Sequence, residues 1–201
     1  MTALPDRPPR RLLAVAAGPM TVAQYAALGE TEDGYTELVN GRLIMSPSAI
    51  PEHNMAHLKL AVQLLNQIPA DLEVVQDTDV DLELATPDRP GYVRRPDVIV
   101  VKRSGLKRRQ AEGGLIRATE VVLAVEVISP GSRNTDYRAK RDEYAWAGIP
   151  FYWIIDIDEP VSLAPMHLAG EFGYQEGPAE TRIYEAIEPF PLKIQVDRLI
   201  D

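Results

Sequence analysis

Two carboxylates beside or within strongly apolar runs are the residues of this sequence best suited to chemistry. Glu126 lies inside the run Val121–Ile128, and Asp97 immediately precedes the run Val98–Val101. A buried ionised carboxylate is costly unless a cation or several hydrogen-bond donors compensate it. On adjacent strands the two side chains would converge at one sheet edge, and such hard oxygen donors suit Mg²⁺, or Mn²⁺ in its place. The pair therefore indicates a metal site that can orient water against a phosphoryl group.

Lys140 and Glu37 are the candidates to complete this site. Lys140 lies on the predicted helix Asp136–Trp146, from which its ammonium can contact a phosphate or steady the attacking water. Glu37 lies on an early predicted strand and can share the metal or hold a metal-bound water. Each also has a structural interpretation: Lys140 as a solvated lysine paired with Asp136, and Glu37 as a polar residue on the exposed side of a strand.

Structural interpretations also exist for the two leading carboxylates. Glu126 can lie at a strand end, facing solvent or an arginine, because structural ion pairs contain perturbed carboxylates too. Asp97 can be part of a strand-entry signal, since it follows proline. His53, near the start of the second predicted helix, is a candidate proton carrier or phosphate contact, or a helix-terminal histidine without such a role. Arg95 and Asp136 are candidates for phosphate contact or an accessory role.

Several other chemistries are excluded by the motif content. The sequence has neither a GxxxxGK[ST] nor a GxGxxG motif, so neither common type of phosphate-binding loop is supported. Its three histidines are not arranged as HExxH, which excludes zincin chemistry. The absence of cysteine excludes disulfides and zinc–thiolate sites.

The net charge of −9 argues against a nucleic-acid partner only until its distribution is considered. Residues 94–141 contain 12 basic and 5 acidic residues, a local balance of +7. Phosphate contacts come from local Lys and Arg side chains, so DNA remains an expected partner. We expect binding to be weak and strongly salt-dependent, because the rest of the chain is acidic.

The elements that must position these residues begin with a short helix and a hairpin. A capping box at Thr21 and Gln24 predicts a helix over Thr21–Leu28. Asn40-Gly41 between two apolar runs predicts a tight hairpin turn at the N-terminal end of the domain. A second helix follows, on which we expect one buried apolar stripe because its large apolar side chains recur every three or four residues: Met55, Leu58, Val62, Leu65 and Ile68.

The remaining segments predict a sheet with a covered centre. Strands that are apolar on both faces belong in the middle of such a sheet, and three runs have this character: 98–101, 121–128 and 151–157. Shorter strands are expected at 72–75, 80–84, 161–168, 181–186 and 192–196, the last three at sheet edges. Together with the helices they predict an α/β or α+β fold.

The predicted organisation is a flexible leader over residues 1–19 and a single domain over residues 20–201. No apolar run approaches the length of a membrane-spanning helix, and the apolar run after Arg10-Arg11 is at the short limit for a secretion signal. We therefore expect a cytoplasmic protein with no membrane association.

Several of these motifs occur in an order that resembles a known family. They are Glu37-Leu38-Val39-Asn40-Gly41, His53, Pro96-Asp97 before an apolar strand, Glu126 in Val-Glu-Val-Ile-Ser-Pro, Asp136 with Lys140, and Gly148-Ile149-Pro150-Phe151-Tyr152-Trp153. Together the motifs span roughly residues 20–160. They resemble the Uma-two family of restriction endonucleases, which belongs to the PD-(D/E)XK nuclease superfamily.

The resemblance implies a restriction-endonuclease-like core, with a mixed sheet flanked by helices and an N-terminal hairpin. It also implies that Asp97 and Glu126 are Mg²⁺ ligands, Glu37 is a further acidic site residue and Lys140 is the catalytic lysine. The superfamily pattern places that lysine two residues after the second acid, where this chain has Ile128. The resemblance implies instead a lysine on the following helix, where Lys140 is at the matching place.

The function implied is a Mg²⁺-dependent endonuclease that hydrolyses DNA phosphodiester bonds with metal-activated water. The alternatives are a nuclease-fold protein that binds nucleic acid or a partner without cleavage, and a hydrolase that uses the same acids on another phosphoester. Fold-level analogy also suggests a homodimer, for which the C-terminal edge strands are a candidate interface.

Overall fold

The computed structural model describes residues 18–29, 34–45, 50–128 and 136–201. Its helices are α1 (Val22–Leu28), α2 (Pro51–Leu65), α3 (Arg103–Glu112) and α4 (Asp136–Trp146). The larger sheet has the strand order β11-β10-β9-β8-β6-β3. In chain order these strands are β3 (Leu72–Gln76), β6 (Val98–Lys102), β8 (Val121–Ile128), β9 (Phe151–Asp156), β10 (Ser162–Leu168) and β11 (Tyr174–Glu176).

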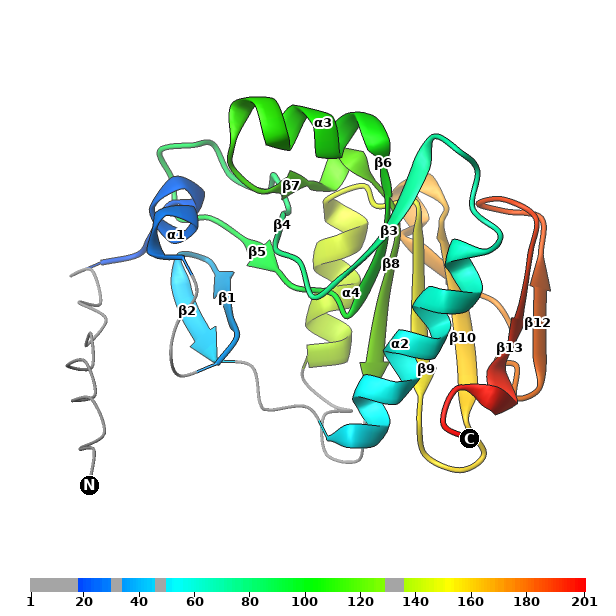
Figure 1. Cartoon of the computed structure of the whole chain (residues 1–201). Coiled ribbons are helices and arrows are strands. Elements are labelled where there is room, and N and C mark those ends of the chain that lie inside the picture. Colours follow the sequence, from blue (N-terminus) through cyan, green and yellow to red (C-terminus); the bar gives the residue numbers. More distant parts are fainter. Residues whose placement is uncertain (1–17, 30–33, 46–49, 129–135) are drawn as a thin grey trace, which may run out of the picture.

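Both faces of this sheet are covered, which confirms the prediction for its central strands. Along β8, Leu123, Val125 and Val127 join one apolar cluster with α2. The alternate residue Ala124 joins another cluster with Tyr144 of α4. Figure 1 shows α2 and α4 on opposite sides of β8. Because side chains alternate along a strand, Glu126 falls on the α4 side.

The parallel pairing of β8 with β9 places α4 beside the sheet. These two strands are parallel, whereas every other pairing in the larger sheet is antiparallel. Parallel neighbours need a crossover connection, and α4 lies in the connection from β8 to β9. The candidate lysine on α4 is thereby returned to the sheet that carries Glu126.

A smaller sheet, in the order β2-β1-β5-β4-β7, brings the N-terminal hairpin to the same region. Its strands are β1 (Thr36–Val39), β2 (Arg42–Met45), β4 (Val80–Asp81), β5 (Val93–Arg94) and β7 (Ile116–Arg117). The hairpin turn is formed as predicted, with positive φ at Asn40 (48°) and Gly41 (74°). The capping box of α1 is also formed.

The predicted buried stripe of α2 is wrong for four of its five residues, whereas Ile68, which follows the end of the helix, is partly buried against the core. Met55, Leu58, Val62 and Leu65 are exposed, and Leu58 and Val62 line a groove of about 380 Å³. The buried side chains lie on another face of the helix: Ala56, His57, Leu60, Ala61 and Leu64. Small alanines on this face allow the helix backbone to lie close to the sheet, which explains why it packs inward.

Other differences are smaller. The predicted strand 80–84 ends at Asp81, because Glu83 has a positive φ of 55°. The strand β10 is internal and not at an edge, since it pairs with both β9 and β11. The basic segment after β6 contains the helix α3, which the sequence pattern did not predict.

The C-terminal strands form a separate hairpin that packs on α2 (Figure 1). They are β12 (Ile183–Ala186) and β13 (Leu192–Gln195). One edge of β13 is already occupied, because Gln67 bonds the backbone N–H and C=O of Lys193, and Gln63 does the same for Gln195. That edge is therefore closed to strand pairing with another copy. In the described part of the chain, no helix has the length and hydrophobicity required to cross a membrane.

Candidate active site

Glu126 is buried on β8 and bonded through both carboxylate oxygens. The Tyr144 hydroxyl donates to its Oε1 at 2.6 Å, and the Lys140 ammonium donates to its Oε2 at 3.0 Å. Burial raises the pKa of Glu126 to about 7; Lys140 opposes this shift, and Asp97 and Glu37 add to it. The position at a solvent-facing strand end is thus excluded, because the residue is only 8% exposed.

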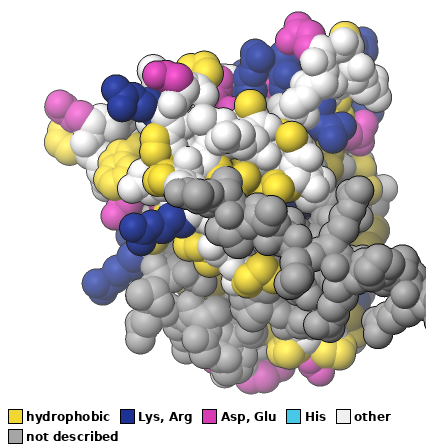
Figure 2. All heavy atoms as spheres, turned by 90° about the vertical axis from the view of Figure 1, so that its left-hand side faces the viewer, with side chains coloured by type: hydrophobic (Ala, Val, Ile, Leu, Met, Phe, Trp, Pro, Cys, Tyr) yellow, Lys and Arg dark blue, Asp and Glu magenta, His cyan; other side chains and the backbone are white. Residues whose placement is uncertain are grey.

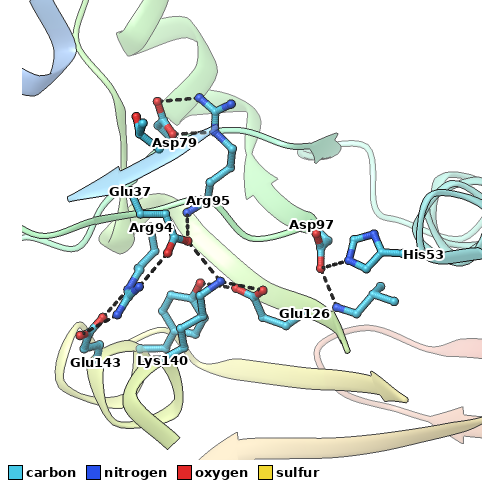
Figure 3. Close-up of polar contacts among 12 residues, drawn as sticks. Glu37, His53, Asp79, Arg94, Arg95, Asp97, Glu126, Lys140 and Glu143 are labelled. Carbon is cyan, nitrogen blue, oxygen red and sulfur yellow. Dashed lines mark hydrogen bonds and ion pairs between the residues drawn. The ribbon is translucent and has the colours of Figure 1, made fainter. Parts of the chain in front are cut away.

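Lys140 bridges two buried carboxylates (Figure 3). Its Nζ lies 3.0 Å from Glu126 Oε2 and 3.1 Å from Glu37 Oε1. Burial lowers the pKa of Lys140, but attraction to Glu126 and Glu37 outweighs it and holds the pKa above its usual value. The side chain is therefore a charged ammonium within the cluster, and not a solvated helix lysine.

Glu37 comes from β1 and is 4% exposed. Its Oε2 accepts a hydrogen bond from Arg94 at 2.7 Å, and its Oε1 accepts one from the backbone N–H of Arg95 at 3.1 Å. Burial raises the pKa of Glu37, but Lys140 and then Arg94 hold it below its usual range. The hairpin therefore supplies a buried, ionised carboxylate to the site and not a residue on its exposed side.

Asp97 lies at the entry of β6, next to the strand of Glu126. The register pairs Val98 with Val125, so Asp97 and Glu126 extend from the same end of the β6–β8 pair. Asp97 Oδ2 accepts the backbone N–H of Val127 at 2.6 Å and lies 3.4 Å from His53 Nε2. The pairing thus places the two residues at neighbouring backbone positions, while Asp97 contacts Val127 and His53 and Glu126 contacts Lys140 and Tyr144.

The three accessory candidates have different surroundings. His53, on α2, faces Asp97 as in Figure 3; burial lowers its pKa, but the hydrogen bond with Asp97 outweighs this and raises it. The guanidinium of Arg95 is held by both oxygens of Asp79, at 2.8 and 3.0 Å, and lies over the Tyr35 ring. It is thus directed away from Glu126. Asp136 begins α4, and its side chain lies outside the described residues.

Sequence reasoning missed three residues of this cluster: Arg94, Glu143 and Tyr144. Arg94 binds Glu143 through two hydrogen bonds, of 2.6 and 3.0 Å, and both residues are buried. A signal existed on α4, where Lys140, Glu143 and Tyr144 are spaced i, i+3 and i+4 and so share one helix face. Arg94 could not be identified in this way, because its partners are far away in the sequence.

The charge balance of the cluster bears on whether a metal ion fits. Among the described residues, four carboxylates accompany two cations: Glu37, Asp97, Glu126 and Glu143 with Arg94 and Lys140. Burial is the main cause of the raised pKa of Glu126, and the negative charge of Asp97 and Glu37 adds to it. A divalent cation beside Asp97 and Glu126 would offset it, and carboxylate oxygens are suitable donors.

The number of protein ligands limits which ion fits. In the part of the chain that the structure describes, no group of three or more His, Cys, Asp or Glu residues could hold a metal. Mg²⁺ commonly binds to one or two carboxylates and takes its other ligands from water and phosphate. The residues present therefore fit Mg²⁺ better than an ion that needs a full protein cage.

The basic segment 94–141 is largely paired with acidic residues. Described pairs are Arg94 with Glu37 and Glu143, Arg95 with Asp79, Arg103 with Glu73, Arg108 with Glu120, Arg117 with Glu112, Lys140 with Glu37 and Glu126, and Arg141 with Glu176. On the face in Figure 2, Lys and Arg side chains form separate groups, several beside acidic side chains. Seven of the twelve basic residues in this segment therefore have described acidic partners, which reduces the positive charge available to a phosphate backbone.

Comparisons with known proteins identify the family and the fold of the chain. A family model named Uma2, described as "Putative restriction endonuclease", matches residues 22–194. A crystal structure described as "a putative nuclease belonging to DUF820" from Anabaena variabilis ATCC 29413 resembles the chain with a TM-score of 0.66. The two are 18% identical, and the likeness covers 90% of this chain and 98% of that one, which confirms the predicted nuclease fold. Among curated proteins, none matches this sequence.

Proposed function

This chain belongs to the Uma2 family, and we propose that it is a divalent-metal-dependent endonuclease that hydrolyses DNA phosphodiester bonds. The observation that carries the proposal is the reach of Lys140 from α4 to Glu126, at 3.0 Å. It supplies an ammonium to the acidic cluster although the superfamily position for that lysine holds Ile128. The absence of a lysine at position 128 favours the alternative of a protein that binds without cleaving, and the contact of Lys140 with Glu126 weakens that argument.

Asp97 and Glu126 are the residues that would hold the ion, with Mg²⁺ as the expected metal. Bound there, a divalent ion supplies a more acidic water and offsets charge on the phosphoryl group. The Lys140 ammonium can hold a phosphate oxygen or the attacking water with its third N–H, because the other two face Glu126 and Glu37. His53 Nε2 lies beside Asp97, at the end of β6 and β8 that also carries Glu126. Its imidazole can accept or donate a proton there.

The proposal is tested by nicking of supercoiled plasmid DNA in Mg²⁺ or Mn²⁺. Wild-type protein is compared with Asp97→Ala and Glu126→Ala, and with two exposed acids as matched controls, Asp88→Ala and Glu185→Ala. We expect nicking that EDTA abolishes, loss of nicking in both site variants and normal nicking in both controls. Equal nicking by all five proteins would overturn the assignment of the site.

A second assay separates cleavage from binding alone. Binding of a labelled DNA duplex is measured by fluorescence anisotropy across a range of salt concentrations, with and without the divalent ion. DNA binding without cleavage in Mg²⁺ or Mn²⁺ would contradict the endonuclease proposal. It would support the alternative of a protein that binds DNA without cleaving it. A DNA affinity that does not change with salt would contradict the expected phosphate contacts.

A further inference from the structure

A buried ion pair next to the proposed site has no assigned role. Arg94, on β5, is 4% exposed, and Glu143, on α4, is 6% exposed. Arg94 Nε donates to Glu143 Oε2 at 2.6 Å and its second terminal nitrogen donates to Oε1 at 3.0 Å. This two-bond arrangement joins the smaller sheet directly to α4.

The same guanidinium also holds Glu37. The remaining terminal nitrogen of Arg94 donates to Glu37 Oε2 at 2.7 Å, so one planar group binds two carboxylates from different elements. Glu37 Oε1 in turn lies 3.1 Å from Lys140 Nζ. Glu37 cannot rotate without breaking its contact with Arg94 or with Lys140. Arg94 therefore sets where the Lys140 ammonium is held.

Tyr144 fixes Glu126 in a comparable way. Its hydroxyl donates to Glu126 Oε1 at 2.6 Å, and its ring packs edge-on against Tyr152 with 5.2 Å between ring centroids. The tyrosine hydroxyl has one O–H donor, which the Glu126 carboxylate accepts. With Lys140 on Oε2, both oxygens of Glu126 are held from one face of α4.

We propose that Arg94, Glu143 and Tyr144 are positioning residues of this site. Arg94 and Glu143 clamp α4 to the hairpin so that Lys140 reaches Glu126, and Tyr144 sets the rotation of the Glu126 carboxylate. The proposal rests on the proposed nuclease function. It goes beyond it because none of the three residues needs to touch the DNA or the metal.

The test compares variants that remove these contacts with variants that make the same change elsewhere. Tyr144→Phe deletes one hydroxyl, and Tyr174→Phe is its control, because Tyr174 is a buried tyrosine that donates to a backbone carbonyl at 2.7 Å. Arg94→Lys keeps the charge but loses the planar pair of donors. Its control is Arg108→Lys, since Arg108 makes a similar two-bond pair with Glu120 at 2.5 and 2.9 Å.

In plasmid nicking, kcat of Tyr144→Phe and Arg94→Lys should fall on the order of 10- to 100-fold with KM for DNA unchanged, because misplaced catalytic groups slow the chemical step. The two controls should keep the wild-type kcat. Wild-type kcat in the two site variants would overturn the positioning role while leaving the nuclease function standing. A fall in kcat of equal size in the controls would also overturn it, since it would reflect a general loss of structure.

Crystal structures of the variants test the same proposal without relying on activity, so it can be judged even if the wild type does not cleave DNA. The Glu126 carboxylate should rotate in Tyr144→Phe, and Lys140 should move out of hydrogen-bonding reach of Glu126 in Arg94→Lys. Unchanged positions of Glu126 and Lys140 in both variants would overturn the proposal.

Discussion

Replacement of Lys140 by methionine should destabilise the protein, and by more at alkaline pH than at neutral pH. Methionine keeps much of the side-chain volume and removes the charge. The change leaves Glu126, 8% exposed, and Glu37, 4% exposed, without the ammonium that lies within 3.1 Å of each. Breaking a buried ion pair from one side costs about 3–5 kcal/mol, because the remaining charge stays buried.

The pH dependence follows from the pKa of Glu126, which is about 7 in the folded protein and ordinarily 4.5. A carboxyl group with a raised pKa in the folded protein loses its proton at lower pH in the unfolded chain. The free energy of unfolding therefore falls as pH rises from the unfolded-state pKa to the folded-state pKa. In the wild type this loss ends near pH 7. In Lys140→Met the pKa of Glu126 is higher still, because Lys140 lowers it in the wild type. The variant therefore continues to lose up to about 1.4 kcal/mol per pH unit above pH 7.

Urea denaturation at pH 6.5 and pH 8.5 measures this difference. The destabilisation by Lys140→Met should be larger at pH 8.5 by on the order of 2 kcal/mol. A double variant with Glu126→Gln should lose most of that pH dependence. The control Lys193→Met removes an exposed ion pair and should change stability by less than about 1 kcal/mol at both pH values. A pH-independent effect of Lys140→Met, or one below about 1 kcal/mol at pH 8.5, would refute the reasoning.

Two further predictions concern the fold and are also measured by urea denaturation. Leu60→Ala should cost about 2–5 kcal/mol because Leu60 is fully buried, whereas Leu58→Ala should cost much less because Leu58 is 53% exposed. A larger loss of stability in Leu58→Ala than in Leu60→Ala would support the buried face of α2 that was predicted from the sequence. Gly91→Ala should cost about 1–3 kcal/mol, because the added Cβ would lie 2.5 Å from Val22 Cγ2 and 2.9 Å from Val22 N. Wild-type stability of Gly91→Ala would show that α1 can shift freely.

Strands and turns were predictable where one local pattern dominated. The run Val121–Ile128 is apolar at almost every position, which is typical of a strand covered on both faces. Asn40-Gly41 favours a tight turn, because both residues adopt positive φ there. The orientation of α2 could not be predicted in this way. The helix has two sets of apolar residues at helical spacing, and packing against the sheet selected the one that contains Ala56 and Ala61.

The sequence predicted which residues are candidates for the site better than it predicted the contacts between them. The apolar surroundings of Glu126 already made its charge conspicuous in the sequence. Its contact with Lys140 depends on the parallel pairing of β8 with β9, which returns α4 to the sheet. The role of Arg94 depends on contacts with residues 57 and 49 positions away, Glu37 and Glu143, and no local pattern encodes such separations.

The most direct test of the account is the rate of Mg²⁺-dependent plasmid nicking by Lys140→Met, set beside Lys193→Met. Both variants lose one lysine that is paired with glutamate, but only Lys140 contacts Glu126. The account predicts that Lys140→Met nicks on the order of 10²- to 10³-fold more slowly than the wild type. Lys193→Met should nick at the wild-type rate. Wild-type nicking by Lys140→Met would contradict the claim that the lysine of α4 serves this site.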